Sequence, residues 1–483
     1  MLRLKAIHHL QDTTLFWAFA ILTILSATLA VVLYEPLPLV APGLVLAGLF
    51  SLNSIRQLYY LFFFLLPFSI EFQIGSFGTD LPSEPMMVGL MGLGLLLLIK
   101  KSKETYAALW THPITLVFIL HLAWIGVTVL TSTYPIVSLK YLLAKCWYVF
   151  PFFFLPQLIL SEEKQYRRLF QILSISMFAA IIFVLIRHSA SGFSFDQSSK
   201  VLRPIFRNHV NYALMLIAFL PYYWHILRTS FTKYKVIGWG LMALLIVAIY
   251  FSYTRAAQIS VVLVVVYYWV VRLRQTVLCV GLALVMLIGL GTYLSWDAKY
   301  LEYAPTFENT IAHKKFDNLV EATAKFEDVS TVERFYRWVA GGYMIKEKPL
   351  MGFGPATFYN NYTSYTVTSY TTYVSDNPEK SGIHNNYLMV AVEQGMIGLL
   401  IMLLVAILPL LYAERTYHLL TDAYEKGLVM AAAMSYFVID VTILINDMLE
   451  ADKVGPLYFL SAAIILWYSV KARGSREEQI EMS

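Results

Sequence analysis

Long uninterrupted blocks of apolar residues are the feature that most constrains the fold of this chain. Of its 483 residues, 58% are hydrophobic and only 14% are charged. A soluble domain carries about 25% charged residues, and a helix needs roughly 20 apolar residues to cross a bilayer. The blocks exclude a water-soluble enzyme, a disordered chain and a disulfide scaffold. The sequence therefore predicts an all-α polytopic integral membrane protein.

The blocks predict fourteen membrane-spanning helices, and twelve is an alternative because the pair around Arg255 could be a broken or re-entrant segment. The predicted spans are 15–34, 37–53, 57–75, 84–99, 113–133, 139–160, 167–187, 205–227, 236–252, 256–271, 276–295, 384–412, 427–446 and 454–470. The first block exceeds the ~7–15 apolar residues of a signal peptide, so we expect it to be an uncleaved helix. Four regions follow, namely a helix bundle (1–295), a hydrophilic loop carrying short helices (296–383), C-terminal spans (384–470) and a tail (471–483).

The distribution of Lys and Arg predicts the orientation of the spans. If the amino terminus is cytoplasmic, 19 of the 36 cationic residues lie inside and seven lie in short outside loops. Lys and Arg accumulate in cytoplasmic loops, and long loops do not follow this rule. We therefore expect both termini in the cytoplasm and the 296–383 loop outside. Because the cations sit mostly at the ends of apolar blocks, they indicate topology rather than a nucleic-acid partner.

The seven cations in short outside loops need a reason, because such loops usually avoid them. They are Lys140, Arg187, Lys200, Arg203, Arg207, Arg255 and Lys453. Four of them cluster in residues 187–207. A bound anion is one explanation, because the planar guanidinium matches phosphate oxygens. For Arg203, Arg207 and Arg255 the pattern favours such a role, whereas Arg187 and Lys200 equally fit contact with lipid headgroups.

The outward 296–383 segment contains one predicted helix. Apolar residues at 3–4 spacing over 330–346 indicate an amphipathic helix, on which Arg334 and Arg337 share a face. The turn-rich run Pro349–Pro355 should end this helix and bend the chain. Residues 358–375 are rich in Tyr, Ser, Thr and Asn, which suits sugar rings, although composition favours an ordinary polar loop.

Several polar residues stand where the outward segments re-enter the membrane. His384 opens a span that also carries Gly395 and Gly398, and glycines let another segment approach closely. A histidine at such a position can take a proton from a hydroxyl, or serve as a hydrogen-bonded structural residue. The same alternatives apply to His209, and since neither histidine has a partner at metal-ligand spacing, we expect no metal site. Asp440 lies in the middle of a span, where a carboxylate is costly, and fits a structural or a functional role equally.

Four runs of residues between about positions 200 and 400 form a combined pattern. They are Arg203 with Phe206-Arg207-Asn208-His209-Val-Asn211-Tyr212-Ala213, then Ser252-Tyr-Thr254-Arg255-Ala256, then Arg334-Phe-Tyr-Arg337-Trp338 leading to Pro349-Leu-Met-Gly352-Phe-Gly354-Pro355, and finally His384-Asn385 followed after nine residues by Gly395-Met-Ile-Gly398. In these runs the sequence resembles the O-antigen ligase and Wzy-type O-antigen polymerase superfamily of bacterial membrane glycosyltransferases. Where many members carry His-Pro-Asn or Asn-Pro-Asn, this chain has Asn208-His209-Val-Asn211, which leaves the role of His209 open.

The resemblance implies a glycosyltransferase of the C type at the periplasmic face of the bacterial inner membrane. The implied reaction transfers a glycan from undecaprenyl diphosphate to a hydroxyl of lipid A–core or a similar acceptor, inverting and without metal or cofactor. His384 would be catalytic. The resemblance implies that Arg203, Arg255 and Arg334 or Arg337 bind the donor, and the charge pattern adds Arg207 to this set. Further candidates for supporting roles are Asn208, His209, Asn211, Asn385, Tyr387 and Asp440.

Two other functions remain open. A polysaccharide polymerase would use a second lipid-linked repeat unit as the acceptor, and the His-x9-Gly pattern favours the ligase. A lipid-linked glycan flippase would also need cations in the membrane, but it should spread them along a central path in two related halves. In this chain the cations concentrate at one face beside a long loop, which favours surface chemistry.

Overall fold

The computed structural model describes residues 55–74, 77–100, 107–230, 234–297, 299, 329–366 and 382–481. The chain divides into two compact units, Met1–Phe63 and Phe64–Ser483. In the first unit only the beginning of an apolar helix, Ile55–Phe68, is described, and there the rings of Tyr59 and Phe63 lie 5.2 Å apart. The predicted spans 15–34 and 37–53 lie outside the described residues.

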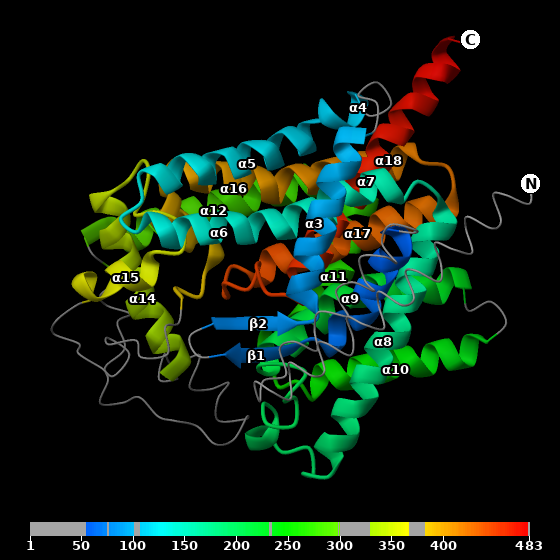
Figure 1. Cartoon of the computed structure of the whole chain (residues 1–483), viewed down its shortest axis with the longest axis horizontal. Helices are drawn as coiled ribbons and strands as arrows, with labels where there is room; N and C mark the ends of the chain where they lie inside the picture. Colours follow the sequence, from blue (N-terminus) through cyan, green and yellow to red (C-terminus); the bar gives the residue numbers. More distant parts are fainter. Residues whose placement is uncertain are drawn as a thin grey trace, which may run out of the picture. The chain divides into compact units, whose positions relative to one another are not determined.

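The second unit is almost entirely helical (Figure 1). Its α-helices are α3 (Ser83–Lys100), α4 (Ala107–Trp110), α5 (Pro113–Leu130), α6 (Pro135–Val149), α7 (Leu155–Ile159), α8 (Glu163–Ser189), α9 (His209–Ser230), α10 (Lys235–Tyr250), α11 (Arg255–Arg272), α12 (Thr276–Ser295), α14 (Val329–Glu347), α15 (Phe358–Tyr362), α16 (Asn386–Leu419), α17 (Ala423–Thr442) and α18 (Gly455–Glu481). A π-helical turn, η4 (Phe150–Phe154), joins α6 to α7, and short 3-10 helices are η2 (Leu66–Phe68), η5 (Phe195–Gln197) and η8 (Thr363–Tyr365).

The predicted fold class is confirmed. Among the described residues, eight helices are long and apolar enough to cross a membrane, and three shorter helices are apolar. Helix α17 packs against α9, α11, α16 and α18, while α5 lies against both α6 and α16 (Figure 1). The predicted amphipathic helix over 330–346 is α14. The last predicted span, 454–470, is shorter than the helix that contains it, because α18 continues through most of the predicted tail to Glu481.

One predicted span, 57–75, is partly wrong. The helix ends at Phe68, and a two-stranded antiparallel hairpin follows, with β1 (Ile70–Ile74) and β2 (Phe77–Leu81) paired so that Ile70 lies opposite Leu81. The reason is the alternation of apolar and polar side chains along β1, which suits a strand and gives no continuous apolar helix face. Gly75-Ser76 between the strands is a turn signal that could have revealed the hairpin.

The helix that follows His384 is broken at Gly395. Gly395 has φ 71° and ψ −177°, which interrupts the backbone ladder of α16. The carbonyl oxygens of Val392 and Glu393 accept hydrogen bonds from the backbone N–H groups of Phe353 (3.1 Å) and Gly354 (2.8 Å). The N–H of Met396 in turn donates to the carbonyl of Pro349 at 2.8 Å. The 349–354 loop therefore pairs the backbone groups that the break releases, as a low-dielectric interior requires.

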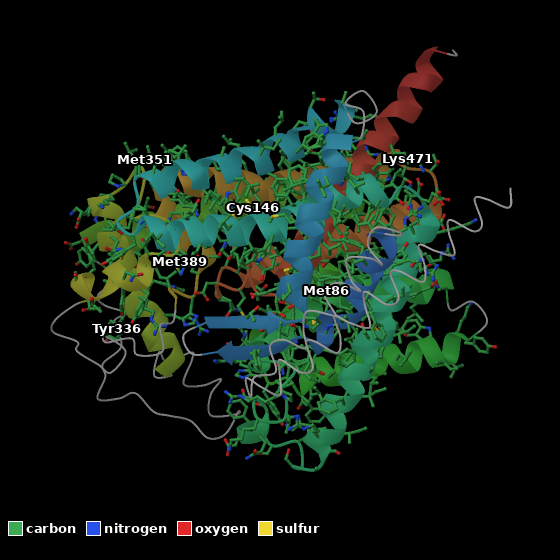
Figure 2. All side chains as sticks on the ribbon, viewed as in Figure 1. Met86, Cys146, Tyr336, Met351, Met389 and Lys471 are labelled. Atoms are coloured by element: carbon green, nitrogen blue, oxygen red, sulfur yellow. The ribbon has the colours of Figure 1, made fainter. Side chains whose placement is uncertain are left out.

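The same loop is fixed by a buried carboxylate and by close packing. The Glu393 side chain accepts hydrogen bonds from the N–H groups of Ala356 (2.8 Å) and Phe358 (3.0 Å). On the other side, the hydroxyl of Ser138 donates to the carbonyl of Pro355 at 2.7 Å, which ties the loop to α6. A small apolar cluster of Ala340, Met344, Phe353, Phe358, Tyr362, Ile383 and Val392 joins α14 to α16, and Met389 packs against it (Figure 2).

We predict that Gly395→Ala will destabilise the fold strongly. A Cβ at this position would lie 2.0 Å from the carbonyl oxygen of Leu350, on a backbone conformation that L residues rarely adopt. Strain and the clash together should lower the free energy of unfolding by about 3 kcal/mol or more. Thermal unfolding of the purified protein in detergent measures the change. Gly126→Ala in α5 is the matched control, because its Cβ would meet no atom within 4 Å. Equal melting temperatures for the two variants would contradict the role of the break.

Candidate functional site

His384 lies beside a carboxylate that the sequence analysis did not single out. Its Nδ1 is 3.6 Å from Oδ1 of Asp447, and the His384 and Asp447 side chains are 28% and 21% exposed. Asp447 belongs to the segment 443–454 that joins α17 to α18, called the hub loop below. Burial raises the pKa of Asp447, but the hydrogen bond and charge of His384 outweigh burial and hold this pKa below its usual value. Both side chains are therefore partly accessible to solvent, and the lowered pKa favours the charged form of Asp447.

The residues just before α16 are held from two sides. The indole N–H of Trp338 donates to the carbonyl of Ile383 at 3.0 Å, and the guanidinium of Arg337 donates to the carbonyl of Gly382 at 3.4 Å. A Cβ on Gly382 would lie 1.7 Å from Oδ2 of Asp447, so the hub loop packs directly on this backbone. Figure 1 shows α14 beside the start of α16. The arrangement brings buried Arg337 close to the backbone just before His384.

Three other predicted residues support the start of α16. The side chain of Asn385 caps the helix by accepting a hydrogen bond from the N–H of Leu388 at 2.9 Å. The hydroxyl of Tyr387 lies 3.4 Å from Oδ1 of Asp440, and the hydroxyl of Tyr458 donates to the same oxygen at 3.0 Å. Asp440 is thus a buried anchor between α16, α17 and α18. Arg334, one turn before Arg337 on α14, is half-buried.

The predicted arginines of the 187–207 loop have different surroundings. Arg203 is exposed, and its backbone carbonyl accepts a hydrogen bond from the guanidinium of Arg187. Arg207 forms ion pairs with Asp80 at 2.6 Å and with Glu71 at 3.5 Å. The hairpin that the sequence analysis missed therefore supplies both carboxylates. Their charge opposes that of Arg207, although Arg207, like Arg203, is exposed.

The start of α9 links this loop to Arg255. The Asn208 side chain accepts a hydrogen bond from the N–H of Asn211 at 2.9 Å, which caps the helix. His209 Nδ1 lies 2.9 Å from the hydroxyl of Ser199, and its carbonyl accepts a hydrogen bond from the hydroxyl of Thr254 at 3.3 Å. Because Thr254 immediately precedes Arg255, the first residue of α11, the two predicted motifs of this region meet at one end of the bundle.

The hub loop also contacts the arginine-bearing loop, through a buried lysine. The ammonium of Lys453 donates to the carbonyls of Pro67 (3.1 Å), Ser69 (2.8 Å) and Ile205, and it lies 4.2 Å from the centre of the Phe206 ring. Burial lowers the pKa of Lys453 to about 8, against the neighbouring Asp452, which raises it. Burial likewise raises the pKa of Asp452 to about 6, against Lys453.

An ion pair with a buried lysine fixes the middle of the hub loop. Glu450 pairs with Lys145 of α6, and its side chain accepts a hydrogen bond from the hydroxyl of Tyr141 at 3.2 Å. The run Asp447-Met-Leu-Glu450-Ala-Asp452-Lys453 was the available sequence signal, since four charges in a short outside loop are unusual. The hub loop thus contacts His384 through Asp447 and the 203–207 region through Lys453, although no direct contact joins His384 to Arg203 or Arg255 among the described residues.

The predicted tyrosine-rich segment, the second glycine of α16 and the possibility of a metal site complete the comparison with the sequence. Tyr362 is buried in the cluster between α14 and α16 and offers no ring face to a sugar, while Tyr370 and Tyr373 lie outside the described residues. Gly398 meets α5, because a Cβ there would lie 3.1 Å from Nε1 of Trp124. Over the described ranges, no group of three or more His, Cys, Asp or Glu side chains is arranged to hold a metal ion.

Comparison with known proteins identifies the segment that contains much of this geometry. Residues 240–403 match the family model described as O-Antigen ligase. The segment includes Arg255, both arginines of α14, His384 and the broken part of α16. No curated protein matches the chain. The family match confirms the resemblance to the O-antigen ligase and Wzy-type polymerase superfamily, and it supports a membrane glycosyltransferase activity of ligase or polymerase type in general.

We predict that Lys453→Met will unfold the end of the bundle that carries the candidate site. Methionine fills a similar volume but leaves three backbone carbonyls and the buried Asp452 without their cation. Breaking such a buried ionic contact costs about 3–5 kcal/mol. The midpoint of thermal unfolding should fall accordingly, whereas Lys140→Met, at an exposed position, should leave it unchanged. If both variants melt like the wild type, Lys453 does not hold these segments together.

Proposed function

We propose that the protein transfers a glycan from undecaprenyl diphosphate to a hydroxyl of lipid A–core or a similar acceptor, as an O-antigen ligase does. The family match over residues 240–403 supports this class of reaction. The observation that carries the proposal is the pairing of His384 with Asp447 near Arg337. This pairing places a base, its carboxylate partner and a cation next to the N-terminus of α16. The proposed location is the periplasmic face of the inner membrane, with both termini in the cytoplasm.

The proposed step is a single displacement at the anomeric carbon. The acceptor oxygen forms a bond to that carbon while the bond to the diphosphate oxygen breaks, so the configuration inverts. The acceptor proton passes to His384, and undecaprenyl diphosphate leaves with the bonding electron pair. The carboxylate of Asp447, at 3.6 Å from Nδ1, stabilises the imidazolium that forms and orients the ring so that Nε2 faces the acceptor. A base of this kind contributes about 10²–10⁴ to the rate.

Arginines are proposed to neutralise the leaving diphosphate. Fixed cations aimed at the developing charge stabilise a transition state more than the ground state. Exposed Arg203 and half-buried Arg255 suit this role, because they stand on neighbouring segments linked through His209. Arg207 is a weaker candidate, since Asp80 and Glu71 already oppose its charge. Arg334 and Arg337 stand nearer His384 and would contact the glycan-bearing end of the donor.

A polymerase is the alternative function. It shares the donor, the arginines and the base, and differs in taking a second lipid-linked repeat unit as the acceptor. Purified protein with lipid-linked glycan, to which candidate acceptors are added one at a time, separates the two. A product of lengthening glycans without any added acceptor would establish the polymerase. A flippase would move the intact donor lipid across vesicles and form no glycosidic bond.

We predict that His384→Ala will abolish glycan transfer while donor binding persists, because the arginines are untouched. Transfer is measured as the glycan ladder in lysates, and binding as retention of lipid-linked glycan on the purified protein. His209→Ala is the matched control and should be milder, since its imidazole contacts the Ser199 hydroxyl within its own loop. A wild-type ladder from His384→Ala would leave this histidine with a structural role only.

Asp447→Asn tests the pairing itself. The variant keeps the shape of the side chain but removes the charge that stabilises protonated imidazole. Transfer should slow with no loss of donor binding, and Asp447→Glu, which keeps the charge, should recover part of the rate. An Asn variant that transfers glycan at the wild-type rate would contradict the proposed action through His384.

We further predict that Arg203→Ala and Arg255→Ala will each reduce transfer severely while the protein stays folded in the membrane. Lysine at either position should restore activity only in part, because an ammonium lacks the bidentate geometry of the guanidinium. Binding of undecaprenyl diphosphate to each purified variant is the accompanying measurement. Full activity of both alanine variants would remove these arginines from the site. Lys140→Ala serves as the control, since it removes an exposed cation that lies outside both arginine-bearing segments.

A further inference from the structure

An apolar groove lies between α9, α10 and α11, with Met434 of α17 also lining it. Its volume is about 380 Å³, and its walls are chiefly aliphatic and aromatic. The aliphatic part of the lining includes Leu220, Met242, Ile246, Val261 and Val265. Ile246 and Val265 are 39% and 55% exposed, so the groove opens on the outer surface of these helices. Such a groove matches a hydrocarbon chain in shape and polarity.

A second chamber of about 350 Å³ continues the groove and is polar. The two share Pro221, Trp224, Arg228, Tyr268 and Met434 in their walls. The second chamber adds Arg272 and Lys426, and the residues lining both chambers include no carboxylate. A long apolar groove therefore ends in a chamber lined by three cations.

The three cations rest on aromatic rings rather than on acids. Arg228 lies 6.0 Å from the Trp224 ring centre, and Lys426 lies 5.4 Å from that of Tyr417. Arg272 lies 5.4 Å from the Trp269 ring centre and donates to the hydroxyl of Tyr268 at 3.1 Å. Within the described part of the chain, none of the three is paired with a carboxylate. Their charge is available to an anion.

The groove lies at the opposite end of α11 from the candidate site. Arg255 is the first residue of that helix and Arg272 is the last. Val261 and Arg272 are eleven positions apart, which corresponds to about 16 Å along a helix, or roughly half of a ~30 Å hydrocarbon core. The groove therefore spans one leaflet, on the side away from His384.

We propose that this groove binds one anionic phospholipid of that leaflet. The headgroup phosphate would contact Arg228, Arg272 and Lys426, and an acyl chain would occupy the apolar part. The absence of acids from the lining disfavours a zwitterionic lipid, whose ammonium would meet only cations. Guanidinium groups bind phosphate oxygens with charge-assisted hydrogen bonds, and basic side chains at a membrane surface attract anionic lipids. The proposal is independent of the proposed transfer reaction.

Native mass spectrometry of the full chain in detergent tests the headgroup site. The protein is exchanged into micelles doped with equal amounts of phosphatidylglycerol and phosphatidylethanolamine. We expect one phosphatidylglycerol to be retained in preference. The triple variant R228Q/R272Q/K426Q should retain it roughly a hundredfold less tightly, at about fivefold for each cation lost. Arg415→Gln, an exposed arginine of α16 outside the lining, should retain it like the wild type.

A variant that fills the groove tests the acyl chain separately. Val265→Trp adds bulk to a partly exposed wall and changes no charge, so it should reduce retention of phosphatidylglycerol while the melting temperature stays the same. Added inorganic phosphate should not displace the lipid. Equal retention of the two lipids, retention unchanged in the triple variant, or displacement by inorganic phosphate would each overturn the proposal.

Discussion

The structure around His384 depends on a broken helix whose exposed backbone is paired by a loop. Gly395 turns the chain out of the helical conformation, and the released carbonyls and N–H group find partners in residues 349–354. In a membrane protein unpaired backbone groups are costly, so the break and the loop require each other. This requirement fixes α14, which precedes the loop, against α16. The cation Arg337 thereby lies near His384, since its guanidinium donates to the carbonyl of Gly382.

The hub loop is the second constraint, and it acts through charge. It meets His384 through Asp447 and α6 through Glu450, and through Lys453 it meets both the residues just before the hairpin and the 203–207 region. Each contact is buried or partly buried, where removing one partner is expensive. The hairpin has a comparable role, since its carboxylates pair with Arg207, whereas Arg203, which is exposed like Arg207, has no carboxylate partner among the described residues. Ion pairing with carboxylates thus distinguishes Arg207 from Arg203, a difference that the sequence alone does not show.

Helix positions were predictable because each span is a local property of hydropathy. The predicted spans 276–295 and 256–271 coincide with α12 and α11 to within a residue, and the amphipathic pattern over 330–346 gave α14. Hydropathy does not reveal the hairpin, because the five alternating residues of β1 directly follow a short apolar helix and continue its apolar block. The partners of the candidate residues were also missed. Lys453 contacts the carbonyl of Pro67 across 386 positions, and no local pattern encodes such a pair.

By itself, the sequence determined that this chain is a helical membrane protein, and it marked His384 and a set of arginines at one face of it. Those conclusions follow from apolar length and from charge placement, which are both readable along the chain. Only the tertiary structure decided which groups act on one another. Asp447 approaches His384 because α17 packs against α16, and the charge of Arg207 is opposed by carboxylates of two strands that lie more than a hundred positions earlier in the chain. Such pairs form between segments that lie far apart in the sequence, and the distance between them is determined by how the helices pack.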